Sequence, residues 1–157
     1  MDTKNVSQII IDGVADDIPL MDIYRGIGGG VKKTEFFKAV ISLIKSRSIR
    51  SDIMVCYCGI DCSRCKTLHA TVDDYDELRK TVQAYYDEFG HNIDIKDLNC
   101  LGCRSDSMLA GCADCPYMKC GKGKGLSRCD ECAEYPCDSL RWYIDKYIKP
   151  GAGKFFD

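Results

Sequence analysis

The segment 111–137, GCADCPYMKCGKGKGLSRCDECAEYPC, decides how this sequence is interpreted, because six cysteines fall within it. The pattern CxxCxxxxC occurs twice, first over Cys112, Cys115 and Cys120 and then over Cys129, Cys132 and Cys137. Two residues between cysteines form a tight turn that directs both sulfurs at one metal ion. The repeat therefore predicts two similar half-sites that pack face to face.

All 12 cysteines of the chain lie between Cys56 and Cys137, and most of them form CxxC pairs. These pairs are Cys62/Cys65, Cys100/Cys103, Cys112/Cys115 and Cys129/Cys132. A tetrahedral zinc ion binds four thiolates at about 2.3 Å, so the pairs fill two sites. In the simplest arrangement the first pair shares an ion with the second, and the third pair shares one with the fourth.

Four cysteines remain outside these pairs. Cys58, Cys120 and Cys137 could form a third site, enter the first two sites, or stay as free thiols. Cys56 could join them or be a buried free thiol, which is a common structural role for cysteine. We therefore expect two or three zinc ions in the chain.

The rest of the composition agrees with a globular protein in a reducing compartment. The chain has 157 residues, 45% of them hydrophobic, and a net charge of −2. Its N-terminus lacks the basic region and apolar run of a secretory signal, and no 18-residue apolar stretch occurs. We therefore expect a cytoplasmic protein without a membrane segment, where metal thiolates are favoured over disulfides.

An iron–sulfur cluster is the alternative to zinc. Cys58, Cys62 and Cys65 form a CxxxCxxC run, the spacing that holds a [4Fe–4S] cluster in radical enzymes. Those enzymes build a much longer barrel around the cluster, and the CxxCxxCxxxCP run of ferredoxins is absent here. Thiolates bind both kinds of centre, so we place zinc first and keep a [4Fe–4S] cluster as the alternative.

Three helices are expected from hydrophobic periodicity, over residues 33–48, 73–90 and 138–149. The cysteine segments between them are short, polar and glycine-rich, which indicates loops and zinc-knuckle-like turns. The expected fold is a small α-rich, irregular, metal-stabilised domain. Residues 1–55 form a partly helical N-terminal extension, residues 56–149 form the cysteine-rich metal-binding domain, and residues 150–157 form a tail.

Residues 56–140 resemble a cysteine-rich family of bacteria and archaea that is catalogued as a domain of unknown function. The resemblance is carried by YCGIDCSRC at 57–65, NCLGC at 99–103, GCADCPYMKC at 111–120 and RCDECAEYPCDSL at 128–140. It implies metal binding by the cysteines of that pattern: Cys58, Cys62, Cys65, Cys100, Cys103, Cys112, Cys115, Cys120, Cys129, Cys132 and Cys137. Cys56 lies outside the pattern, and the resemblance carries no activity to this chain.

The first functional hypothesis is a binding or interaction module that structural zinc holds in shape. Its partner could be a protein or a single-stranded nucleic acid contacted by Lys119, Lys122, Lys124 and Arg128, with aromatic residues nearby in sequence. The iron–sulfur alternative predicts a redox or electron-transfer protein. An enzyme is disfavoured, because no HExxH motif, no HxE…PCxxC motif and no Ser–His–Asp pattern occurs.

Overall fold

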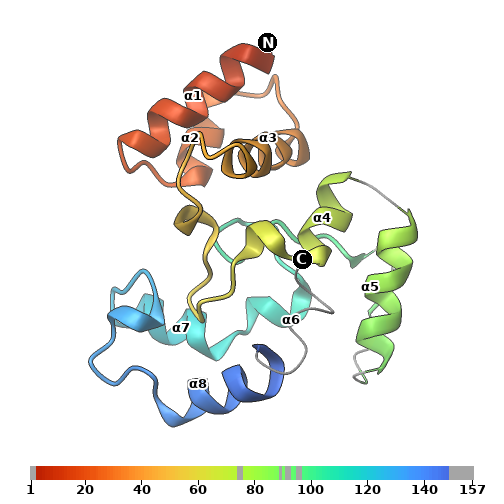
Figure 1. Ribbon diagram of the computed structural model, residues 1–157, viewed down its shortest axis with the longest axis vertical. Coiled ribbons are helices and arrows are strands. Elements are labelled where there is room, and N and C mark those ends of the chain that lie inside the picture. Colours follow the sequence, from red (N-terminus) through yellow and green to blue (C-terminus); the bar gives the residue numbers. More distant parts are fainter. Residues whose placement is uncertain (1–2, 74–75, 89, 91–92, 95–96, 149–157) are drawn as a thin grey trace.

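The computed structural model describes residues 3–73, 76–88, 90, 93–94 and 97–148. Within these ranges the chain is helical or irregular, and its β-structure is limited to one antiparallel bridge between Val55 and Asp61. Figure 1 shows helices α1–α3 at one end of the molecule and α6–α8 at the other, with α4 and α5 to one side. The expected helix-rich, irregular architecture is confirmed at this level.

The N-terminal residues form a three-helix unit of α1 (Thr3–Ala15), α2 (Leu20–Ile27) and α3 (Lys33–Lys45). Helix α3 confirms the helix expected over 33–48 and buries Phe36, Phe37, Val40 and Ile41. Helices α1 and α2 are not among the helices expected from hydrophobic periodicity. Gly13 interrupts the apolar run in sequence but suits the helix, because a Cβ there would lie 2.6 Å from Ile23 Cδ1 of α2.

Helices α4 (Lys66–Asp73) and α5 (Asp76–Glu88) pack against each other beside the cysteine segments. Helix α5 confirms the helix expected over 73–90 and buries Val82 against a small cluster that includes Leu98. Helix α4 lies where the sequence indicated a loop. Its buried face includes small polar side chains such as Thr67 and Thr71, which give hydrophobic periodicity little signal.

The C-terminal third consists of short elements joined by turns. They are α6 (Ala110–Ala113), α7 (Pro116–Gly123), the 3-10 turn η4 (Cys129–Glu131), α8 (Asp138–Tyr143) and the π-helical η5 (Ile144–Ile148). The last two elements confirm the helix expected over 138–149. Helix α7 occupies part of the segment expected as loops. Pro116 stands in its first turn, where proline costs no hydrogen bond.

A continuous apolar core links the N-terminal helices to the first cysteine segments. Its buried members include Phe37 of α3, Met54 of the 3-10 turn η1 (Asp52–Met54), Cys62, Leu68 and Leu101. On the surface, an ion pair joins Lys33 of α3 to Asp106 in the loop before α6. Residues 3–54 therefore pack directly on the cysteine-rich part. In the part of the chain that the structure describes, no helix is both long and apolar enough to cross a membrane.

Candidate metal centre

The first cysteine segment is a tight double turn between η1 and α4. Gly59, with a φ of +94°, lets the chain reverse, and Cys56 N donates to Ile60 O at 2.7 Å. The next turn is η2 (Cys62–Arg64), whose N-terminus is capped by Asp61 accepting from Ser63 N at 3.0 Å. These hydrogen bonds place Cys56 and Cys62 side by side, although five residues separate them in sequence.

Four thiols lie near one another at this turn. The sulfurs of Cys56 and Cys62 are 2.9 Å apart, and Cys103 and Cys58 lie close enough to Cys56 to shift its pKa. Cys56 and Cys62 are buried, whereas Cys58 and Cys103 are half-buried, and all four are free thiols. Cys56, which lies outside the family pattern, therefore belongs to this group of thiols.

Glycine is required where the second cysteine segment approaches the first. Gly102 has a φ of +91°, and a Cβ on it would lie 3.3 Å from Cys62 Sγ. A larger residue would be strained in this conformation and would push against the sulfur. The CxGC form of the Cys100/Cys103 pair thus brings Cys103 to the thiols of the first turn.

Arg104 holds three cysteine segments together. Its guanidinium lies 5.1 Å from the centre of the Tyr57 ring, and Nε donates to Val55 O at 2.7 Å. Its terminal nitrogen donates to Ser127 O, also at 2.7 Å, just before the fourth CxxC pair. Arg104 therefore supplies both hydrogen bonds and a positive charge beside the clustered sulfurs.

Proton sharing dominates the electrostatics of this cluster. Hydrogen bonds to Cys103 and to the other two thiols, together with burial, raise the pKa of Cys56. Hydrogen bonding with Cys56 lowers the pKa of Cys103 to about 6. Hydrogen bonding with Cys56 likewise lowers the pKa of Cys58. Cys56 therefore retains its proton, which it shares with the neighbouring thiols. A divalent cation in place of this proton would allow all four sulfurs to ionise together.

Burial is the main cause of the pKa shift at two cysteines beside the cluster. It raises the pKa of Cys65 to about 11 and raises the pKa of Cys100. The two thiols also interact electrostatically with each other and with Cys62, and Cys100 interacts with Cys112. The thiols of the first and second CxxC pairs are thus electrostatic neighbours, and their sharing of one ion stays a prediction.

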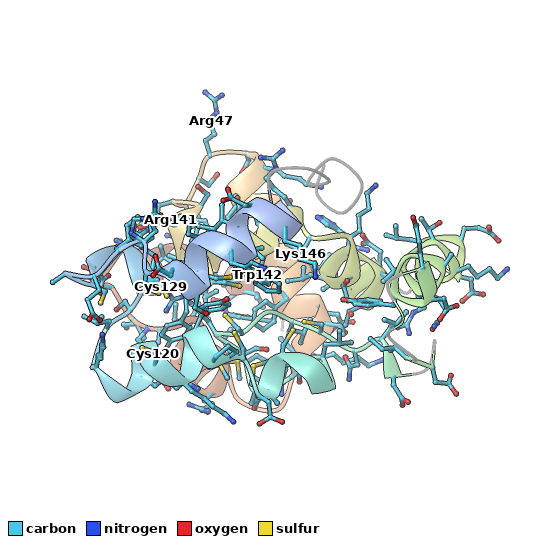
Figure 2. All side chains as sticks on the ribbon, turned by 90° about the horizontal axis from the view of Figure 1, so that it is seen from below. Arg47, Cys120, Cys129, Arg141, Trp142 and Lys146 are labelled. Atoms are coloured by element: carbon cyan, nitrogen blue, oxygen red, sulfur yellow. The ribbon has the colours of Figure 1, made fainter. Side chains whose placement is uncertain are left out.

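The third and fourth CxxC pairs are more exposed. Cys129 has Cys58, Cys120, Cys137 and Cys115 as electrostatic neighbours. Figure 2 places Cys120 and Cys129 on the same side of the molecule, on α7 and η4. In the third pair, Cys112 thus has Cys100 as an electrostatic neighbour and Cys115 has Cys129.

Within the described ranges, no three cysteine, histidine or acidic side chains already surround a common point at metal-binding distances. The Cys56–Cys62 sulfur separation of 2.9 Å is shorter than a tetrahedral metal site allows. Sulfurs on a tetrahedral zinc ion lie about 3.8 Å from one another, given zinc–sulfur bonds of about 2.3 Å. The donor set suits a soft metal ion, but its sulfurs must move apart to hold one.

The remaining candidate residues have local partners. His69 Nε2 lies 2.8 Å from Ser63 O, so the ring is engaged with the backbone of η2. Residues 119–128 form a basic segment, in which three side chains pair with acids: Lys119 with Asp114, Lys124 with Glu134 and Arg128 with Asp130. These pairs neutralise much of the charge that a nucleic acid would meet there.

Comparison with known proteins gives one match. Residues 54–142 match the family model described as "Protein of unknown function (DUF3795)", which covers more than half of the chain. The match begins just before Cys56 and ends within α8, so it includes every cysteine. No curated protein and no solved structure matches the chain.

Proposed function

The chain belongs to the DUF3795 family of proteins of unknown function, and we propose that it is a metal–thiolate module whose cysteines bind zinc. The observation that carries this proposal is the convergence of Cys56, Cys58 and Cys62 with Cys103, about 40 residues further along the chain. Four partly or wholly buried thiols near one another are a good donor set for a soft cation.

The module would bind two or three zinc ions through the cysteines of the family segment. Each structural zinc ion contributes on the order of 10 kcal/mol to folding, which matters most where few apolar side chains are buried. The zinc would act as a crosslink that presents a rigid surface to a partner, and we assign it no reaction. Contact with a single-stranded nucleic acid through the basic segment is a second proposal. Three of the basic side chains already pair with acids, which leaves less positive charge for phosphates.

The test is the metal content of full-length protein purified under anaerobic conditions. Elemental analysis is expected to give two to three zinc ions per chain, with colourless protein and thiols that react only after chelation. Iron together with acid-labile sulfide and a brown colour would instead establish the [4Fe–4S] alternative. Protein without any metal, and with unchanged thermal stability in a strong chelator, would contradict both.

A further inference from the structure

We propose that Cys56, Cys58, Cys62 and Cys103 are the ligands of a single four-thiolate metal site. The inference rests on the proposed function and refines it, because it assigns Cys56 as a ligand. It also divides the two CxxC pairs Cys62/Cys65 and Cys100/Cys103, giving only one cysteine of each to this site.

Contacts among the sulfurs give the first argument. The sulfurs of Cys56 and Cys62 lie 2.9 Å apart. Cys103 lines the same small cavity as Cys62, and its neighbour Gly102 would place a Cβ 3.3 Å from Cys62 Sγ. Cys58 and Cys103 also lie close enough to Cys56 to shift its pKa, whereas the thiols that shift the pKa of Cys65 are Cys62 and Cys100. The backbone of the first turn thus places Cys56 beside Cys62, on the side that Cys103 approaches.

Space for the ion is the second argument. The sulfurs of Cys56 and Cys62 need to separate by about 0.9 Å to reach the spacing of a tetrahedral site. A cavity of about 10 Å³ lies beside Cys62, and its lining also includes Gly102 and Cys103. A rotation of the Cys62 or Cys103 side chain toward this space would open the cluster without displacing the backbone.

Charge is the third argument. Four thiolates around a divalent ion carry a net charge of −2, which is costly in a buried position. Arg104 follows Cys103 directly and donates to Val55 O, next to Cys56, at 2.7 Å. Its guanidinium therefore stands at the edge of the proposed site and offsets part of that charge. A disulfide between Cys56 and Cys62 would use only two of the four thiols and would need no such cation.

The direct test uses the wild-type protein with ¹¹³Cd in place of its native metal. Scalar coupling between each cadmium resonance and the β-protons of its ligands identifies which cysteines share an ion. We expect one resonance to couple to Cys56, Cys58, Cys62 and Cys103. A resonance that couples to Cys62 and Cys65 together, or cadmium without coupling to Cys56, would overturn the assignment while leaving the metal–thiolate function intact.

Zinc stoichiometry in variants gives an independent test. Cys56→Ser and Cys103→Ser are each expected to remove one zinc ion, and the double variant is expected to remove one rather than two. Cys56→Ser combined with Cys137→Ser is the matched control, because Cys137 lies in the exposed fourth segment and its loss should add to that of Cys56. Full zinc content in Cys56→Ser would overturn the inference. Wild-type protein without metal would instead refute the proposed function.

Discussion

Residues 3–54 and residues 110–148 both consist of helices joined by turns, but they differ in how many hydrophobic side chains they bury. The N-terminal region packs Ile10, Phe36, Phe37 and Val40 in a core from which water is excluded. In the C-terminal region, the only buried hydrophobic side chains among those described are Met118 and Leu140. The C-terminal region holds half of the cysteines instead. Apolar burial stabilises the first region, and we expect the second to depend on the proposed metal–thiolate crosslinks.

The largest expected effect is the loss of the C-terminal region on metal removal. A strong chelator should abolish hydrogen-exchange protection over residues 110–148 while α1 and α3 stay protected, because neither helix contains a cysteine and both bury mainly apolar side chains. Each zinc ion removed should cost on the order of 10 kcal/mol of local stability. Hydrogen exchange followed by mass spectrometry would measure this effect. Equal loss of protection in both regions, or none in either, would contradict the comparison.

A smaller effect is expected where α7 packs against Tyr57 in the first cysteine segment. Gly121 of α7 packs against Tyr57, and a Cβ at Gly121 would lie 2.5 Å from Tyr57 Cδ1. Gly121→Ala should therefore destabilise the protein by about 1–3 kcal/mol through overpacking. Urea unfolding of the metal-loaded protein would measure the change.

Gly123 provides the matched control on the same helix. A Cβ at Gly123 meets nothing within 4 Å, so Gly123→Ala should be neutral, or stabilising by up to about 1 kcal/mol through helix propensity. If both substitutions have the same effect, the contact between Tyr57 and α7 does not stabilise the fold.

The smallest effect is expected at the basic segment. The double substitution Lys122→Ala with Lys124→Ala removes one ion pair, Lys124–Glu134, whose members are largely exposed. Exposed ion pairs contribute little, so stability should change by less than about 1 kcal/mol. Fluorescence anisotropy with a labelled single-stranded RNA would test the contact proposed for this segment. Binding that weakens with salt and with the double substitution would support a nucleic-acid surface. An anisotropy that does not change when the protein is added would contradict it.

Periodic and composition-based features of the fold could be predicted from the sequence. Helices α3, α5 and α8 have apolar residues repeated at helical spacing, and the predicted helices coincide with them apart from their ends. Helices α1, α4 and α7 could not be predicted in this way. Each contains a glycine or small polar residues on its buried face, and their helical state depends on neighbours such as Ile23 and Tyr57.

The sequence by itself determined that cysteines dominate residues 56–137, because twelve cysteines, eight of them in CxxC pairs, need no tertiary information to be recognised. Only the tertiary structure decided which thiols meet. The turn at Gly59 brings Cys56 to Cys62, and the close approach of Gly102 brings the second CxxC pair to the same turn, although spacing along the chain indicates neither contact. Contacts across loops are set by packing that local patterns do not contain.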